Sequence, residues 1–443
     1  MKFRKIFTLV TAAAMCLTIS SCGGNGNEQV PETAAAETTA EGKKTIKMLV
    51  MNGGEDIYIS EFNRTNEEYE IVVENREFTN LENAIDTFNL EIMTGNTPDI
   101  LNGFFLPLES YAEKGLLANY YDFIDNDPEM SREDFFQNIF KAYEVNGGLY
   151  QNIVRFYLNI IAGKQSIAGE MQGRTTDDFL DLAEKYPDKK FTDWQWSKHN
   201  AFGFFMGRGW ESFVDKETGK CDFCNERFYR ILEFSNTFPD TVDESYKLDL
   251  NWRRSEADDL RNEKTLFASY SFIVSHFYNL RIEEEQTFGE PAAVIGYPYV
   301  EGNGALIQAD GSYAVFEDSP VKEGAWEFLR YFYSDEYQKK IVREYSLPVK
   351  RSAIEFAAED AKKGLYLDYA EEYTDEYGIN TDEDNQRVID LIEGAACRSG
   401  SSDNSVYNII LEETETYFAG QKSAEEVAEI IQNRVQNYLD ENR

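Results

Sequence analysis

The sequence predicts an α/β protein with two domains. Its 443 residues exceed what one small hydrophobic core accommodates, and a 42% share of hydrophobic residues allows two large cores. Strand and helix patterns alternate over residues 45–101, which is typical of a doubly wound lobe with a parallel sheet. Residues 156–292 differ, because they are rich in helix patterns and aromatic side chains and contain few clear strands.

The alternation begins with a β-α-β unit. A strand is predicted over residues 45–51, a helix from Ile57 to about Asn66, and a second strand over residues 71–73. Because a helix connects the two strands, we expect them to pair in parallel.

A longer helix follows this unit. Asn80 is expected to cap its start and Gly95 to end it. Its apolar stripe comprises Leu81, Ala84, Ile85, Phe88, Ile92 and Met93. The turn Thr97-Pro98-Asp99 then leads into the short apolar run Ile100-Leu101, which predicts the next strand.

Strand patterns return at residues 294–297 and 313–316, and the rest of the chain is mostly helical. Near the C-terminus, Ser423 and Glu426 form a capping box. The helix that it starts has an apolar face of Val427, Ile430, Ile431, Val435 and Tyr438.

The N-terminus has the layout of an export signal. Basic residues at positions 2, 4 and 5 precede an apolar run over residues 6–19, which is too short to span a bilayer. Ile19-Ser20-Ser21-Cys22 resembles the lipobox of bacterial lipoproteins. This resemblance implies that residues 1–21 are a signal peptide and that Cys22 is lipidated. In the alternative, Cys22 is merely a neighbour of the cleavage site. Residues 23–44 have almost nothing to bury and are expected to form a flexible tether.

Charge and cysteine content argue against two kinds of partner, nucleic acids and metal ions. The net charge of −38 repels nucleic acid and anionic headgroups, so no nucleic-acid partner is expected. Cys221 and Cys224 have CxxC spacing, which suits a redox pair, half a zinc site or a disulfide; an incidental pair, or a local disulfide if the surroundings oxidise, is favoured. No second CxxC exists, and His199 and His276 are the only histidines, so we predict no metal site.

Enzyme motifs are not found. The sequence contains no Gly-x-Ser-x-Gly, no HExxH and no P-loop. Paired carboxylates of the kind that glycoside hydrolases use carry no information here, because 81 acidic residues make such pairs inevitable. We therefore expect a protein that is not an enzyme and needs no cofactor.

Four segments, in order along the chain, carry a family resemblance. They are EIMTGNTPDI at 91–100, AWEFL with SDEYQ over 325–338, LPVKRSA at 347–353 and YFAGQKS at 417–423. Together with the lipobox and tether, they resemble the extracellular solute-binding lipoproteins of ABC sugar importers, of the family 1, maltose-binding-protein-like type.

The resemblance implies a two-lobed periplasmic-binding-protein-like fold of type II, with a hinge and a ligand cleft between the lobes. The N-terminal lobe would comprise residues 45–155 plus 295–345, and the C-terminal lobe residues 156–294 plus 346–443. The chain would cross between the lobes near residues 153–157, 292–297 and 345–350. Residues 158–290 match the family only loosely.

Ligands of open α/β sheets bind beyond the carboxyl ends of the strands. This rule selects Asn52, Gly53, Gly54 and Glu55, which follow the first strand and could also form an ordinary strand-to-helix turn. Asp99 is a further candidate, since a carboxylate there could accept from two hydroxyls. In the family, the corresponding aspartate often braces its loop instead.

A sugar site needs flat aromatic platforms and polar groups at its rim. The helix-rich middle, where the family places such platforms, contains Trp194, Trp196, Trp210 and Trp252. Core or surface packing is the alternative for each. Polar candidates near the implied crossings or cleft edges are Tyr270, Tyr313, Arg155 and Arg351, with hinge hydrogen bonding as the alternative.

The resemblance therefore implies a monomeric substrate-binding component of an ABC importer, anchored by lipid to the outer face of the bacterial cell membrane. It would capture a sugar or oligosaccharide by hinge closure and deliver it to the membrane permease. The alternatives are an exported glycan-active lipoprotein enzyme and a surface sensor or interaction protein that kept the fold.

Overall fold

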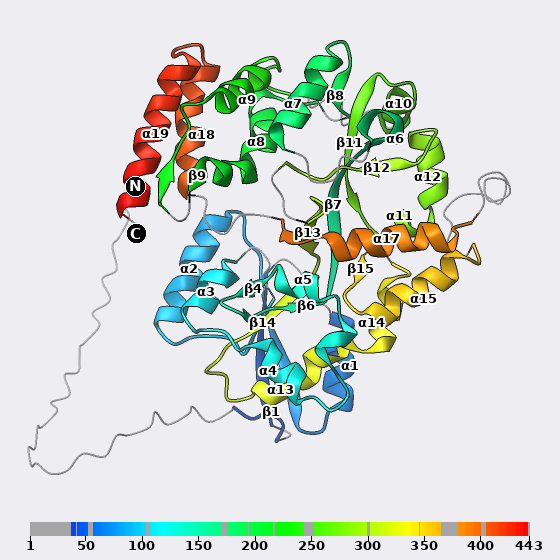
Figure 1. Ribbon diagram of the computed structural model, residues 1–443. Coiled ribbons are helices and arrows are strands. Elements are labelled where there is room, and N and C mark those ends of the chain that lie inside the picture. Colours follow the sequence, from blue (N-terminus) through cyan, green and yellow to red (C-terminus); the bar gives the residue numbers. More distant parts are fainter. Residues whose placement is uncertain are drawn as a thin grey trace, which may run out of the picture. The chain divides into compact units, whose positions relative to one another are not determined.

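The computed structural model, shown in Figure 1, contains two α/β lobes, each built around its own sheet. It describes residues 37–40, 42–51, 56–102, 106–169, 175–193, 195–215, 218–242, 252–298, 302–344, 346–364, 379–399 and 405–441. Residues 1–36, with the proposed signal peptide and Cys22, lie outside the described residues.

The first sheet has the strand order β2-β1-β3-β14-β6. Its strands are β1 (Lys44–Met51), β2 (Tyr69–Arg76), β3 (Ile100–Asn102), β6 (Asn152–Ile153) and β14 (Ser312–Val315). Strand β1 pairs in parallel with β2 and β3, which confirms the predicted β-α-β unit. Strand β14 is antiparallel to both β3 and β6, so β6 runs in the same direction as β1 and β3.

The helices of this lobe follow the expected local signals. Asn80 accepts from Asn83 N–H and caps α2, and Gly95 with φ +76° follows the end of the helix, as predicted. Helices of this lobe and its border are α1 (Asp56–Thr65), α2 (Leu81–Met93), α3 (Leu108–Glu113), α4 (Tyr120–Asn126), η1 (Arg132–Asp134), α5 (Gln137–Lys141), α13 (Lys322–Leu329), η4 (Arg330–Tyr333), α14 (Asp335–Ile341) and α15 (Arg351–Ala361). A short hairpin of β4 (Glu144–Val145) and β5 (Gly148–Leu149) lies near α4.

The second sheet is organised around β7 (Arg155–Lys164), which pairs with strands on both sides. The other strands are β8 (Lys190–Thr192), β11 (Thr265–Phe272), β12 (Ala292–Val294), β13 (Leu306–Ala309), β15 (Leu347–Pro348) and β16 (Cys397–Arg398). The expectation of few strands in the middle of the chain is wrong for β7 and β11. Strand β7 alternates between half-buried and buried residues only over its first six positions, and β11 is continuously buried over its first four. The period-two pattern that marks a strand in sequence is therefore short in both.

Helices cover both faces of the second sheet (Figure 1). One apolar cluster includes Ile161 and Phe267, and a smaller one on the other face includes Ala162 and Ala268, because neighbouring residues of a strand point to opposite faces. The helices of this lobe are α6 (Gln165–Ala168), α7 (Thr176–Lys185), α8 (Lys198–Gly209), η2 (Trp210–Phe213), α9 (Glu226–Asn236), α10 (Trp252–Arg261), α11 (Val274–Tyr278), α12 (Leu280–Thr287), α17 (Asp382–Gly394), α18 (Ser405–Phe418) and α19 (Ala424–Glu441).

Two features complete this lobe. A second hairpin consists of β9 (Val214–Asp215) and β10 (Lys220–Cys221). The predicted capping box before α19 is confirmed, since Ser423 N–H donates to Glu426 Oε2 at 2.8 Å and Glu426 N–H to Ser423 Oγ at 3.2 Å. None of the described helices is long and apolar enough to cross a membrane.

The chain passes between the sheets where β6 leads into β7, at Val154, and where β13 leads into β14, at residues 310–311. It passes again between α14 and β15, because β15 pairs with β7. The predicted crossing at residues 292–297 is wrong. Strands β12 and β13 both pair with β7, so residues 295–309 belong to the second lobe and the first lobe resumes at Ser312.

These connections orient the two sheets. Strands β1 and β3 run parallel to β6, which continues directly into β7, so their carboxyl ends face the junction of the lobes. Strand β11 is antiparallel to β7 and parallel to β8, so the carboxyl ends of β8 and β11 face the same junction.

The folded body begins earlier than predicted. Thr38 pairs with Lys44 in an antiparallel bridge, and Thr45 N–H donates to the carbonyl of Glu37 at 2.8 Å. The expectation of a free tether up to residue 44 is therefore wrong for its last residues, which hydrogen-bond to the start of β1.

Candidate functional site

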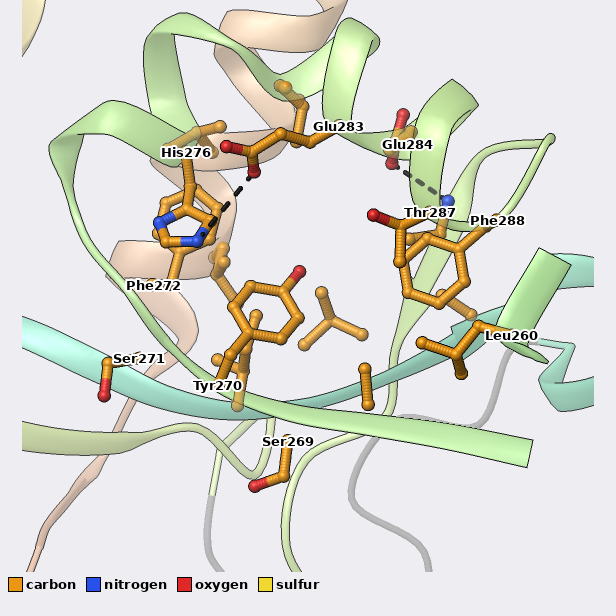
Figure 2. Close-up of a pocket in the computed structure, with 18 of the residues that line it drawn as sticks. Leu260, Ser269, Tyr270, Ser271, Phe272, His276, Glu283, Glu284, Thr287 and Phe288 are labelled. Atoms are coloured by element: carbon orange, nitrogen blue, oxygen red, sulfur yellow. Dashed lines mark hydrogen bonds and ion pairs between the residues drawn. The ribbon is translucent and has the colours of Figure 1, made fainter. Parts of the chain in front are cut away.

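A cavity of about 1970 Å³ lies in the second lobe. Its walls are formed by β7, β11 and β12 on one side and by α10, α11, α12 and α17 on the other. One end of the cavity reaches Phe272, at the carboxyl end of β11 (Figure 2). All the described lining residues belong to the second lobe.

The aromatic wall of the cavity comes from β11 and the helix that follows. Tyr270 points from β11 into the cavity, whereas Ser269 and Ser271 point to the other side of the strand (Figure 2). The ring of His276, on α11, stacks on Tyr270 at 5.1 Å between centroids and on Phe272 at 5.6 Å. The His276 ring therefore packs against both neighbouring rings at the carboxyl end of β11.

His276 is oriented by its neighbours. Ile273 N–H donates to Nδ1 of His276 at 3.2 Å, which leaves Nε2 to carry the proton of the neutral imidazole. Nε2 lies 3.9 Å from Oε2 of Glu283, on α12 (Figure 2). Glu283 therefore lies beside the edge of the aromatic wall.

The hydroxyl of Tyr270 is buried, and several carboxylates act on it. Burial raises the pKa of Tyr270 far above its ordinary value, and Glu283, Glu284 and Asp193 raise that pKa further. The phenol remains a hydrogen-bond donor at every physiological pH. Carboxylates from different elements thus converge on this end of the cavity.

Glu284 and Arg387 form a neutralised pair. Glu284, 8% exposed, accepts from both terminal nitrogens of Arg387 and from the N–H of Ala292 at 2.9 Å. The hydrogen bonds to Glu284 raise the pKa of Arg387. This bidentate pair ties α12, α17 and β12 together and leaves little charge for a ligand.

Glu256, on α10, is in a different situation. Burial, and secondly the nearby Asp193, raise the pKa of its carboxyl to about 8, against a weaker opposing effect of Lys190. Its Oε1 atom is buried and has no hydrogen-bond partner among the described residues. Glu256 is therefore largely protonated at neutral pH.

Of the residues nominated from the sequence, Tyr270 lines this cavity. Six others are described and lie elsewhere: Asp99, Arg155, Trp196, Trp210, Tyr313 and Arg351. Asn52, Gly53, Gly54, Glu55 and Trp194 lie outside the described residues, as does the side chain of Trp252, which begins α10.

The two described tryptophans among the nominated residues, Trp196 and Trp210, pack into the second lobe. Trp196 lies 5.0 Å from Phe204 and 5.3 Å from Phe191 between ring centroids. Trp210, at the end of α8, packs against the same apolar cluster. Both remain partly exposed.

Asp99 and Tyr313 belong to the first lobe. Asp99, 8% exposed, precedes β3 and accepts from Lys47 N–H at 2.7 Å and from Ser319 Oγ at 2.6 Å. It therefore braces the amino end of β3, away from the junction. Tyr313, 2% exposed, stacks on Phe332 at 5.2 Å.

The two arginines hold chain segments together. Arg155, at the start of β7, donates to Asp310 Oδ2 and to Tyr337 OH, both at 3.1 Å. It thereby joins two of the connections between the lobes. Arg351 pairs with Glu393 and lies over the ring of Phe136 at 4.7 Å, which links α15 to α17 and to the start of α5.

Sequence reasoning missed Glu256, His276, Glu283 and Arg387 as site residues. Three of them were hidden among many charged residues without a motif. His276 offered a signal, because it is one of two histidines and follows a predicted candidate, Tyr270, by six residues.

The CxxC pair is not part of the cavity. Cys221 and Cys224 are free thiols in the structure, which corresponds to an incidental pair rather than a local disulfide. Burial raises the pKa of the Cys221 thiol to about 11, which makes it a poor nucleophile. Among the described residues, no group of three or more ligating side chains is placed to hold a metal ion.

Residues 58–363 match the profile of the bacterial extracellular solute-binding proteins. No curated protein matches the chain. The match covers more than half of the sequence, including β7, β11 and most of the residues that line the cavity.

Solved structures share the fold at low sequence identity. The sugar-binding protein MalE from Xanthomonas citri has a TM-score of 0.54 and 13% identity over 90% of this chain and 98% of that chain. A cyclic α-maltosyl-1,6-maltose binding protein from Arthrobacter globiformis has a TM-score of 0.51 and 14% identity over 90% of this chain and 100% of that chain. An ABC substrate-binding protein from Listeria monocytogenes, in complex with cycloalternan, has a TM-score of 0.50 and 15% identity over 90% of this chain and 99% of that chain. The two-lobed periplasmic-binding-protein fold is thereby established.

Proposed function

The chain belongs to the bacterial extracellular solute-binding proteins, and from this premise we propose that it is the substrate-binding component of an ABC importer for a saccharide. The family acts outside the cell, so the protein is exported. Binding without covalent chemistry accounts for the proposed role, and a single chain suffices for it.

The aromatic wall of the cavity carries the saccharide proposal. Sugars have apolar C–H faces and a rim of hydroxyls, so they bind on flat rings flanked by carboxylates. Tyr270, His276 and Phe272 supply the rings, and Glu283 lies at their edge. The described structural relatives include proteins named for binding sugars, which supports the same class of ligand.

Hinge closure is the proposed mechanism of capture. A ligand shifts a two-state equilibrium only through contacts that differ between the states, so it must touch both lobes in the closed form. The cavity wall at the end of β11 would supply one side. Residues 52–55, which follow β1, would supply the other, because the carboxyl ends of both strands face the junction.

The hinge would be the set of connections around Arg155. Hinges are a few residues at the ends of elements that absorb the rotation. Val154 and residues 310–311 are such positions, and Arg155 cross-links them through Asp310. We propose that these segments bend while the sheets move as units.

Delivery to the permease is the second half of the proposal. Lipidation of Cys22 would hold the body near the membrane through the segment that precedes Glu37. Such a tether raises the effective concentration of the binding protein at its permease without any new contact. The permease would recognise the closed arrangement of the lobes.

Calorimetry and thermal-shift measurements with a panel of neutral mono- and oligosaccharides test the ligand class. We expect stabilisation by at least one saccharide and no consumption of it. Turnover of a glycan would identify an exported enzyme instead. No stabilisation by any saccharide would overturn the importer proposal and favour a sensor or interaction protein.

Tyr270 provides the matched variants for that measurement. Tyr270→Ala removes the ring and should weaken binding of the saccharide about tenfold, whereas Tyr270→Phe keeps the ring and should cost about threefold or less. Met93→Ala, 82% exposed on α2, is the control and should bind as the wild type does. Equal affinities of Tyr270→Ala and the wild type would place the ligand elsewhere.

A further inference from the structure

An ion pair joins the two lobes outside the chain connections. Arg398, on β16 of the second sheet, donates from its Nη2 atom to Oε2 of Glu109, on α3 of the first lobe. The side chain of Arg398 is 22% exposed and that of Glu109 is 29% exposed. Because both are largely shielded from water, salt screens this pair less than a pair on the open surface.

Arg398 is held in place by the second lobe. Its strand β16 pairs in parallel with β13, and Arg398 lies opposite Ile307 in this pairing. The carbonyl oxygen of Arg398 accepts from Nη2 of Arg208, on α8. The guanidinium of Arg398 therefore moves with the second lobe.

Glu109 is fixed to the first lobe at the edge that faces the junction. It lies in the first turn of α3, whose residues Leu108, Tyr111 and Ala112 are buried in an apolar cluster of that lobe. Helix α3 follows the carboxyl end of β3, which faces the junction of the lobes. The carboxylate of Glu109 therefore moves with the first lobe, and its pair with Arg398 spans the junction.

Tyr143 makes a further contact between the lobes, beside a chain crossing. This residue precedes β4 and is 7% exposed, and its hydroxyl accepts from Ala309 N–H at 2.7 Å and donates to the carbonyl of Ile307 at 3.2 Å. Ala309 ends β13, directly before the crossing at residues 310–311. The guanidinium of Arg398 lies over the ring of Tyr143, 6.0 Å from its centroid. Because a rotation about the crossing displaces nearby atoms least, the buried contact of Tyr143 suits a pivot.

The ion pair is more easily broken than the pivot contact. A charge-assisted hydrogen bond weakens steeply once its donor and acceptor separate or lose their alignment. The lobes need to part by only a few ångströms at α3 for the carboxylate of Glu109 to leave the guanidinium of Arg398. The pair therefore distinguishes the joined arrangement of the lobes seen in the structure from a more open one.

We propose that Glu109 and Arg398 form an ionic latch that holds the two lobes together before any ligand binds. The latch goes beyond the proposed function, since it acts on the equilibrium between joined and open lobes and needs no particular ligand. A partly exposed ion pair contributes modestly, so its loss should raise the ratio of open to joined molecules about threefold.

Pulsed electron paramagnetic resonance on the ligand-free protein tests the latch. Spin labels attached through non-natural amino acids at Met93 and Asp188 report the distance between the lobes and leave the native cysteines untouched. Met93 is 82% exposed on α2 of the first lobe, and Asp188 is exposed between α7 and β8 of the second. Glu109→Gln keeps the size of the side chain and removes its charge, so we expect it to raise the population with the longer distance about threefold.

Control measurements separate the latch from a general effect of charge. Glu113→Gln removes the same charge from an exposed position of α3 and should leave the distances unchanged. Arg398→Gln should produce the same shift as Glu109→Gln, and the double variant should shift no further than either single variant, because both remove one interaction. High salt should move the wild type toward Glu109→Gln. Circular dichroism confirms that each variant is folded.

Each outcome bears on one proposal. Unchanged distances in Glu109→Gln, or shifts of the two single variants that add up in the double variant, would overturn the latch. Neither result bears on the saccharide proposal, which rests on the cavity in the second lobe. If no saccharide stabilises the protein, that proposal fails and the latch stands, since it is measured without a ligand.

Discussion

Glu256 owes its properties to its place in the cavity wall. Burial costs the charged form of a carboxyl more than the neutral form, and a neighbouring carboxylate adds repulsion. Both effects raise the pKa of Glu256 to about 8. Asp99 is the opposite case, because two donors satisfy its buried oxygens. Both are acids in an acid-rich sequence, and only their surroundings distinguish them.

The pKa of Glu256 predicts a pH dependence of stability. The unfolded chain loses this proton near the ordinary pKa of 4.5, whereas the folded protein keeps it up to about pH 8. The folded state therefore binds more protons across this window, and the free energy of unfolding falls as pH rises. Glu256→Gln should remove that fall. Between about pH 5 and pH 8, we expect the free energy of unfolding of Glu256→Gln to rise by roughly 1 kcal/mol relative to that of the wild type, after discounting for solvent screening.

Urea unfolding of both proteins at several pH values measures this difference. Glu285→Gln serves as the control for the loss of one negative charge. A difference in stability between Glu256→Gln and the wild type that is the same at every pH would contradict the prediction.

At the scale of elements, local sequence signals were sufficient to predict where helices begin and end. They were not sufficient to predict strands that pair with distant parts of the chain. Asn80, Gly95 and the Ser423 capping box were predicted correctly, because a cap is formed by residues within one turn. Strands β7 and β11 were missed, because their pairing partners are distant in sequence. A buried strand in a sheet covered on both faces has no distinctive periodicity.

Two glycines in helices show how packing overrides propensity. Replacing glycine by alanine inside a helix stabilises it by up to about 1 kcal/mol where space permits. A Cβ atom on Gly207, in α8, would meet nothing within 4 Å, so Gly207→Ala should be stabilising. A Cβ on Gly324, in α13, would overlap the ring of Tyr69, so Gly324→Ala should destabilise the protein by roughly 1–3 kcal/mol.

Urea unfolding of the two variants checks this contrast, and each serves as the control for the other. A Gly324→Ala variant as stable as the wild type would show that the contact between α13 and β2 does not limit packing there, and a destabilised Gly207→Ala would contradict the prediction for α8.

At the scale of the whole molecule, the connections between the lobes determine where a hinge can lie. The resemblance to a known family implied three crossings, and the pairing of β12 and β13 with β7 moved one of them from residues 292–297 to residues 310–311. Arg155 cross-links that crossing to the start of β7. An apolar run in sequence does not reveal which of two sheets it joins, because both sheets bury it equally well.

The anchor belongs to this scale as well. If Cys22 is lipidated, Cys22→Ala should move the protein from the membrane fraction to the medium, while the folded body keeps its affinity for saccharide. Cell fractionation followed by calorimetry of the released protein measures both effects. Cys16→Ala, within the apolar run, is the control and should remain at the membrane. Retention of Cys22→Ala at the membrane would contradict the lipid anchor.

The sequence by itself determined the β-α-β start, the helix caps and the membership of a binding-protein fold, because each depends on neighbouring residues or on ordered motifs. Tertiary structure alone decided the site. Asp193, Glu256, Tyr270, Glu283 and Arg387 are brought to one cavity by the pairing of β7 with β11 and by the packing of α10, α12 and α17. Charges that are unremarkable along an acidic chain become a site when folding buries them together, because burial strengthens their interactions and removes the water that would satisfy them.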